Sequence, residues 1–179
     1  MIGTIFSDDR TYRYTLYREW EPSKPLVAFI GLNPSTADET NNDPTVTRCI
    51  NFAKAWGAGR FVMLNLFAYR STDPKALYAV ADPVGPENAK MVATVTGNYA
   101  RLVVCAWGTH GRKRFPEHTM DFQAMLWRVS EARGVQFCCL GKNADGSPKH
   151  PLYLRGDSWP VDLWTGERWP GFNMIGGAT

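Results

Sequence analysis

Apolar and polar positions along the chain predict strands and helices in alternation. Four apolar runs are typical of buried strands: Leu26–Ile30, Arg60–Leu66, Leu102–Trp107 and Val135–Leu140. Helices are predicted by a capping Asp followed by Pro or by apolar residues at helical spacing: from Asp43-Pro44, from Asp73-Pro74 through Val80, over Pro86–Ala100 and over Glu117–Ala132. This alternation predicts a largely parallel sheet with helices on both of its faces.

The amino-terminal segment has a different period. Residues Thr4–Trp20 alternate at period two around the turn Ser7-Asp8-Asp9-Arg10, which predicts a β-hairpin. We therefore expect a three-layer α/β/α sandwich with a central, mainly parallel four-stranded sheet plus this hairpin. The expected single domain has its hairpin in residues 1–24, its core in 25–164 and an irregular, glycine-containing tail in 165–179.

Composition narrows the class of protein. The 179 residues are 44% hydrophobic and 13% aromatic, which favours a packed globular domain over a disordered chain. No apolar run reaches membrane-spanning length and the start lacks the pattern of a signal peptide, so we expect a cytoplasmic protein. The four cysteines form no CxxC pair and are expected to be reduced core thiols. The net charge of +3 is compatible with nucleic acid but is weak support for it.

Short polar motifs follow the apolar runs. They are Gly31-Leu32-Asn33-Pro34-Ser35, Asn65-Leu66-Phe67, Trp107-Gly108 and, after a loop, His150-Pro151-Leu152-Tyr153. The carboxyl ends of parallel strands share one crevice, so these loops are expected to meet there. Two amides and one imidazole at a common crevice indicate a pocket for a flat polar ligand, which we interpret as a nucleobase.

Each of the three polar side chains also has a structural interpretation. Asn33 offers a donor and an acceptor to a ligand, or it caps its own backbone. The Asn65 amide matches a pyrimidine edge, or it bonds to a neighbouring loop. His150 is a positioned donor or a structural histidine, whereas His110 and His118 flank a cationic stretch and are expected to be solvated.

The ordered motifs resemble those of the uracil-DNA glycosylase superfamily. Gly31-Leu32-Asn33-Pro34-Ser35 is similar to the first motif of that superfamily, and His150-Pro151-Leu152-Tyr153 is similar to its second. Between them, Val62-Met63-Leu64-Asn65 and Val104-Cys105-Ala106-Trp107-Gly108 resemble two further strand ends. The overall pattern resembles an uncharacterised, glycosylase-like bacterial and phage family (DUF1643-like) in which the first and last motifs recur.

The resemblance implies a mechanism and residue roles. Such enzymes flip a base out of the duplex and hydrolyse its bond to deoxyribose, with the base leaving as an anion. By that resemblance His150 donates to the pyrimidine O2, Asn33 positions the attacking water, and Asn65 selects the base edge. Asn33 is neutral, so slower chemistry is expected than in members with Asp there. The remaining base-binding residues would be Gly31, Leu32, Ser35 and Phe67.

Two departures from the superfamily affect specificity and DNA binding. Ser35 stands where the uracil-specific branch has a Tyr that shuts out C5-substituted pyrimidines, so the pocket is expected to admit a larger base. The Ser-Pro after His-Pro is missing, and Leu152 and Tyr153 either form a wedge in the vacated stack or pack against the core. Phe67 or Tyr69 is expected to stack on the base.

Basic residues supply candidate phosphate contacts. Arg112, Lys113 and Arg114 follow the third strand, and they either contact DNA phosphates or form a solvated charged loop. Lys149, with Lys142 and Arg155, would extend such a surface.

The function predicted from these features is that of a monofunctional DNA N-glycosylase acting on uracil or a C5-modified pyrimidine and leaving an abasic site. Repair and defence against phage DNA both fit. The expected partner is duplex or single-stranded DNA, bound by a monomer with no metal or other cofactor. Two alternatives stay open: a non-catalytic nucleic-acid-binding module with a base pocket, and a nucleoside- or nucleotide-processing enzyme.

Overall fold

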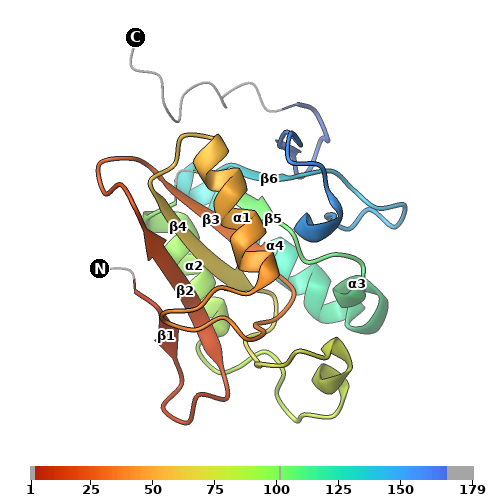
Figure 1. The fold of residues 1–179 in the computed structure, drawn as a ribbon. Coiled ribbons are helices and arrows are strands. Elements are labelled where there is room, and N and C mark those ends of the chain that lie inside the picture. Colours follow the sequence, from red (N-terminus) through yellow and green to blue (C-terminus); the bar gives the residue numbers. More distant parts are fainter. Residues whose placement is uncertain (1–2, 101, 169–179) are drawn as a thin grey trace.

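The computed structural model describes residues 3–100 and 102–168. Within these residues the chain forms a seven-stranded sheet in the order β1-β2-β4-β3-β5-β6-β7 (Figure 1). The strands are β1 Ile5–Phe6, β2 Arg13–Glu19, β3 Leu26–Gly31, β4 Arg60–Asn65, β5 Leu102–Cys105, β6 Phe137–Cys139 and β7 Val161–Asp162. The central sheet was expected to have four strands, but in the described part of the chain it has seven, because the strands of the predicted amino-terminal hairpin, β1 and β2, join it through β2 and because β7 is added at the other edge. The middle strands β4, β3, β5 and β6 are parallel, and antiparallel β2 and β7 extend the sheet on either side.

Among the described residues, four α-helices and two 3₁₀ turns connect the strands. They are α1 Pro44–Ala55, α2 Asn88–Asn98, α3 His110–Arg114 and α4 Pro116–Arg133, with 3₁₀ turns η1 Pro74–Tyr78 and η2 Pro151–Tyr153. The carboxylates of Asp43 and Asp73 accept from backbone amides of the following turns at 2.8 and 2.9 Å, which confirms both predicted starts. Gly134, with φ of 63°, ends α4 as predicted. The basic stretch expected as a loop forms the short helix α3.

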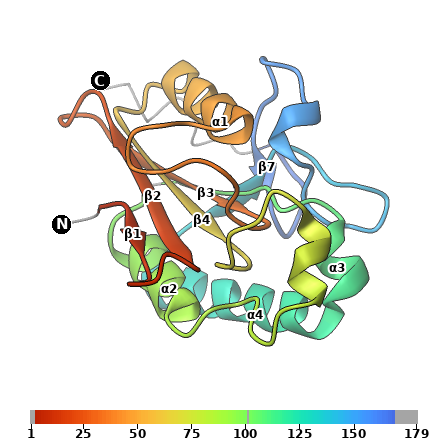
Figure 2. The ribbon, with the colours of Figure 1, turned by 60° about the horizontal axis from the view of Figure 1, so that its bottom comes forward.

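Helices cover both faces of the sheet (Figure 2). On one face α1 packs on side chains of the central strands, and the rings of Phe29 and Trp56 stack at 5.8 Å. On the other face α2 and α4 bury Val92 and Leu126 against Ile30 and its neighbours. All six residues of β3 are buried, as a strand covered on both faces requires. The two cores together hold the carboxyl ends of the parallel strands in place.

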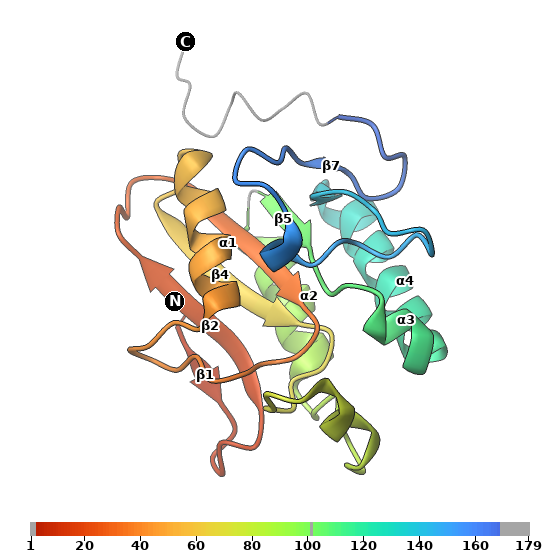
Figure 3. The ribbon, with the colours of Figure 1, turned by 45° about the vertical axis from the view of Figure 1, so that its right-hand side comes forward.

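The connections after β3 and β5 leave the sheet in opposite directions. The chain after β3 runs to α1 on one face, whereas the chain after β5 runs to α3 and α4 on the other. Because β3 and β5 are neighbours, their divergent loops open a crevice between them. Figure 3 shows β3 and β4 ending at the same edge of the sheet, beside the amino-terminal end of α1.

The end of the described chain is less irregular than expected. Residues 165–168 turn back on β7, where the Asp162 amide donates to the Glu167 carbonyl at 2.8 Å and Arg168 bridges Val161. The rest of the expected tail, residues 169–179, lies outside the described residues. Among the helices of residues 3–100 and 102–168, none is both long enough and apolar enough to cross a membrane.

The four cysteines provide a test of the core packing. Cys49, Cys105, Cys138 and Cys139 are all buried and unbridged, and burial raises the pKa of each thiol. We expect the native protein to resist alkylation by iodoacetamide at pH 8 and to take up four labels in denaturant, counted by mass spectrometry. Fast labelling of a native cysteine would contradict the packing described here.

Candidate functional site

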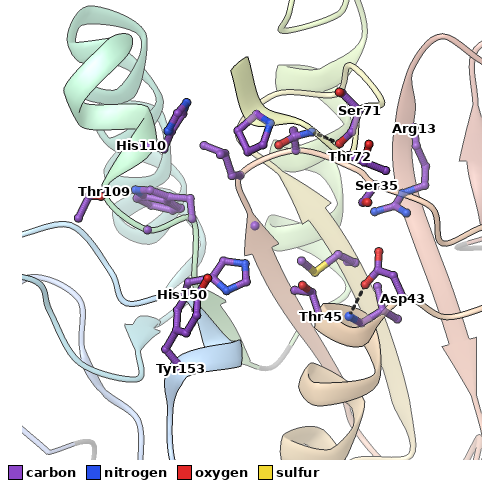
Figure 4. A pocket seen from close by; sticks show the side chains of 18 of the residues that line it. Arg13, Ser35, Asp43, Thr45, Ser71, Thr72, Thr109, His110, His150 and Tyr153 are labelled. Carbon is purple, nitrogen blue, oxygen red and sulfur yellow. Dashed lines mark hydrogen bonds between the residues drawn. The ribbon is translucent and has the colours of Figure 1, made fainter. Parts of the chain in front are cut away.

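A pocket of about 410 Å³ lies at the carboxyl ends of the parallel strands (Figure 4). Its volume falls within the range of small-molecule sites. The loops after β3, β4, β5 and β6 all contribute side chains, and β2 and the start of α1 complete the wall. Asn33 and His150, which are far apart in sequence, line this same pocket.

Hydrogen bonds between loops hold the pocket open. The Ser71 amide donates to the Pro34 carbonyl at 2.9 Å, and Asn33 Nδ2 donates to the Ser71 carbonyl at 2.9 Å. These two bonds tie the loop after β3 to the loop after β4. On the opposite side, the Gly108 amide donates to the Pro148 carbonyl at 3.0 Å and ties the loop after β5 to the loop after β6. The site is therefore built on cross-braced loops.

Asn33 combines the structural role and the binding role that the sequence left open. Its Nδ2 donates to the carbonyls of Pro34 and Ser71 at 3.1 and 2.9 Å, so both amide protons are used within the protein. The remaining polar atom, Oδ1, has no partner among the described residues. Asn33 can therefore accept a hydrogen bond from a ligand or water in the pocket, but it has no free donor.

His150 is held as a donor toward the pocket. Its Nδ1 accepts a long hydrogen bond from the Leu152 amide at 3.4 Å, which favours the neutral tautomer with the proton on Nε2. Burial lowers the pKa of His150 below 6.5, and the charge of Asp43 partly opposes that shift. The turn that carries the ring is anchored to α1, because the Arg48 guanidinium donates to the Leu154 carbonyl.

Asp43 is a carboxylate in the pocket that the sequence interpretation used only as a helix cap. It is 7% exposed, and only its Oδ1 is engaged, accepting from the Val46 amide. Figure 4 shows Asp43 and Thr45 across the pocket from His150 and Tyr153. A signal was present in the sequence: a helix that follows a parallel strand begins at the carboxyl edge of the sheet, so its cap belongs to the crevice.

Arg13 is a second charged residue of the pocket that the sequence interpretation missed. The side chain is 1% exposed at the start of β2, and its Nη1 donates to the Ala37 carbonyl at 2.9 Å. Burial lowers its pKa to about 10, while the charge of Asp43 acts in the opposite direction. No ion pair within 4 Å joins these two described residues, so both charges remain available to a ligand in the pocket.

Asn65 lies beneath the pocket floor. Both polar atoms of its amide are buried without a partner among the described residues, so the expected alternative of a bond to a neighbouring loop is absent there. A Cβ at Gly31 would come within 3.2 Å of Asn65 Oδ1 and 2.6 Å of Met63 Cε. Gly31 and Met63 line the pocket and Asn65 does not. A larger residue at position 31 would therefore require the flexible end of Met63 to shift and would crowd the Asn65 amide.

Unpartnered polar atoms gather at this site. Besides Asn65, the buried Nε of Arg13 and Nε1 of Trp107 have no hydrogen-bond partner among the described residues, and both side chains line the pocket. Buried polar groups in native proteins are nearly always paired. Four of the nine unpartnered buried side-chain atoms among the described residues lie in or beneath this cavity, which makes it a candidate site for a polar ligand.

The other predicted base-binding residues do not all lie in the pocket. Gly31, Leu32 and Ser35 line the pocket, but Phe67 does not. The Phe67 ring is buried on the α4 side of the sheet, 4.7 Å from the ring of Phe115. The other stacking candidate, Tyr69, lines a neighbouring hollow instead. The aromatic side chains that line the pocket are Trp107, Tyr153 and the two histidines His110 and His150.

The predicted DNA-contacting residues are exposed around the pocket. Arg112, Lys113, Arg114 and Lys149 are exposed on α3 and on the loop before His150. Leu152 is 42% exposed and Tyr153 is 87% exposed, so neither packs in the core. Leu152 and Tyr153 are therefore free to form the apolar wedge, which is one of the two roles that the sequence left open for them.

Two histidines expected to be solvated are instead engaged. His110 lines the pocket, and its Nε2 bonds to the Tyr78 hydroxyl while the two rings stack at 5.4 Å. His118 is half-buried, with Nε2 3.1 Å from the Leu66 carbonyl. Both lie against aromatic rings that the sequence could not place near them.

One family matches most of the chain. The family described as a protein of unknown function (DUF1643) matches residues 13–152, which include every residue that lines the pocket except Tyr153. The chain belongs to the DUF1643 family. No curated protein and no solved structure matches it significantly. Within the described residues of this DUF1643 protein, no group of three or more His, Cys, Asp or Glu side chains is placed to hold a metal ion.

The protonation of His150 in this DUF1643 protein can be measured directly. We expect an NMR titration, assigned with a His150→Gln variant, to give a pKa below 6.5 and the Nε2-protonated tautomer above it. Between that lowered pKa and 6.5 the unfolded chain binds the proton more readily than the folded protein, so this group makes stability fall as pH drops through that window. A pKa at or above 6.5 would contradict the buried donor geometry.

Proposed function

We propose that this protein is a DNA N-glycosylase that hydrolyses the bond between a flipped pyrimidine and its deoxyribose, leaving an abasic site. The observation that carries the proposal is the placement of a neutral, donating imidazole and a carboxylate, His150 and Asp43, across one polar pocket. The motifs similar to those of the uracil-DNA glycosylase superfamily support the same chemistry. Its partner is DNA, bound by a monomer.

His150 and Asp43 stabilise the two opposite charges that develop in the reaction. When the glycosidic bond breaks, its electron pair leaves with the base, and the sugar becomes positively charged. His150 Nε2–H donates to the pyrimidine O2 and stabilises the leaving anion. Water then bonds to the sugar carbon and gives its proton to Asp43, while the Asn33 Oδ1 orients it. Asp43 thus supplies the negative charge that a neutral Asn33 lacks.

The floor of the pocket sets the choice of base. Ser35 is small and leaves room at the pyrimidine C5, so the substrate is uracil or a C5-modified pyrimidine. Asn65 reads the base edge once the flexible Met63 side chain moves aside from Gly31. The unpartnered amide then gains the hydrogen bonds that the free protein does not provide.

The rim of the pocket is suited to a flipped nucleotide. Leu152 and Tyr153 project beside the pocket and fill the space that the extruded base vacates. Arg112, Lys113, Arg114 and Lys149 contact phosphates on that side. Both DNA repair and defence against phage DNA remain compatible with this activity.

Replacing Asp43 by Asn tests the proposed mechanism. We expect the wild-type protein to form abasic sites in an oligonucleotide carrying uracil or a C5-modified pyrimidine, and Asp43→Asn to do so roughly 100-fold more slowly because it cannot take a proton. Asn caps a helix as well as Asp, so the unfolding free energy should change little. The assay measures alkali-induced strand scission in single-turnover experiments.

The same assay separates the alternatives. Asp43→Ala is the matched control for the cap, since it should lose about 1 kcal/mol of stability as well as activity. Base-dependent binding without scission of any oligonucleotide would instead indicate a binding module. Cleavage of free nucleosides alone would indicate a nucleoside-processing enzyme.

Replacing Asn65 by Leu tests whether this buried amide is kept for the ligand. The shapes are similar, so removing an unpartnered buried amide should stabilise the free protein by about 1–3 kcal/mol. The variant should bind and cleave the base-containing strand less well. Denaturant unfolding and single-turnover scission measure the two effects, and a loss of stability would mean that Asn65 has a structural role.

A further inference from the structure

A second hollow of about 470 Å³ adjoins the pocket on the side of the loops after β3 and β4. It shares Ser35, Ser71 and Thr72 with the pocket, and Figure 4 shows these three on the side away from His150 and Tyr153. Its outer part is lined by Arg10 and Arg70 together with further hydroxyl side chains. No carboxylate is among the described residues that line it. The hollow is thus cationic and rich in hydroxyl donors.

The two arginines are held in place. Both guanidinium groups lie over the ring of Phe6, at 3.9 Å for Arg10 and 4.9 Å for Arg70. Arg70 Nη1 donates to the Arg10 carbonyl at 3.2 Å, and Arg10 pairs with Glu39 at 2.7 and 2.9 Å. Arg70 has no acidic partner within 4 Å among the described residues, and its Nε is buried without a hydrogen bond. Arg70 therefore presents an uncompensated, pre-ordered charge.

The backbone conformation of Arg10 also bears on the role of its side chain. Its φ is 59°, and it is the one non-glycine residue with positive φ among residues 3–100 and 102–168. Side chains other than Gly, Asn and Asp pay roughly 1 kcal/mol or more for this conformation. An arginine at a turn position suited to Gly or Asn indicates a role for its side chain.

We propose that this hollow binds a backbone phosphate of the DNA strand whose base occupies the pocket. This inference rests on the proposed function, because it takes the nucleotide in the pocket to be part of a strand. Guanidinium groups and hydroxyls are the donors that phosphate oxygens prefer. Since the two cavities share Ser35, Ser71 and Thr72, base and phosphate belong to neighbouring positions of one strand.

The proposal defines the path of the strand. The cationic hollow lies on one side of the pocket, and α3 with its Arg112, Lys113 and Arg114 lies on the other. A DNA strand that crosses the pocket is therefore bound at phosphates on both sides of the extruded nucleotide. The phosphate site in the hollow uses residues of the amino-terminal turn and of the loop after β4, which the sequence pattern did not connect.

The experiment measures binding, so it does not depend on cleavage. The probe is an oligonucleotide with an uncleavable tetrahydrofuran abasic residue, made in versions with one neutral methylphosphonate at each flanking phosphate. Arg70→Gln removes the charge, and Arg128→Gln, exposed on α4 away from both cavities, is the matched control. Dissociation constants come from fluorescence anisotropy over a series of salt concentrations.

We expect one phosphate position at which the methylphosphonate weakens binding roughly tenfold in the wild type and in Arg128→Gln, with no further loss in Arg70→Gln. Arg70→Gln should also lower the salt slope by about 1. Arg10→Asn, which suits the positive φ, should weaken binding while keeping the protein folded. This last variant separates loss of a contact from loss of the fold.

If the losses of binding free energy from Arg70→Gln and from the methylphosphonate add at every position, the inference is wrong. Strand scission of a pyrimidine-containing oligonucleotide by the same wild-type preparation would show that the proposed function still holds. A free pyrimidine deoxynucleoside 5′-monophosphate distinguishes the other source of phosphate. If Arg70→Gln weakens binding of this mononucleotide and not of the oligonucleotide, the hollow serves free nucleotides, and the assignment to a DNA strand is wrong.

Discussion

The pairing of β3 with two parallel neighbours, β4 and β5, is the constraint on which the rest of the structure depends. With both edges occupied and both faces covered by helices, β3 can expose only its carboxyl end. The loops after β3 and β5 then leave toward opposite faces, and the crevice between them cannot be filled by either. Asn33 and His150 lie on loops around this opening, whereas Arg13 reaches it from β2, so the position of the site follows largely from the topology.

Close packing at that opening explains why its residues depend on one another. Gly31 accommodates the side chains of Met63 and Asn65, since a Cβ there would displace the end of Met63 and crowd the Asn65 amide. Beyond the strand, Asn33 donates one amide proton to the Ser71 carbonyl of the loop after β4 and the other to the Pro34 carbonyl of its own loop. These two bonds brace the loop and leave only Oδ1 of the Asn33 amide to accept from a ligand. Asp43 is the only negatively charged group among the described residues that line the pocket.

The sequence predicted the parallel core, three helix ends and the convergence of Asn33 with His150, because apolar periodicity and capping residues report on local structure. It predicted the hairpin over Thr4–Trp20 but not that β2 would pair with β4, and it did not predict the edge strand β7, since the pairing of short strands is decided by tertiary contacts. Phe67 was assigned to the pocket by its spacing from Asn65. The alternation of faces ends with β4, however, and both Leu66 and Phe67 turn to the opposite core. Asp43 and Arg13 escaped notice because a cap and a strand arginine each have a sufficient local explanation.

The energetics of the site point to ligand binding independently of the reaction. Each buried polar group without a partner costs about 1–3 kcal/mol, and a domain of this kind has a total stability of only about 5–15 kcal/mol. Arg13, Asn65 and Trp107 each contribute such a group in or beneath one cavity. A fold optimised for stability alone would replace them with apolar side chains of similar shape. Arg13 and Trp107 line the cavity, and both of their unpartnered atoms are donors, so a ligand that carries hydrogen-bond acceptors would satisfy them, and the proposed nucleotide carries such acceptors.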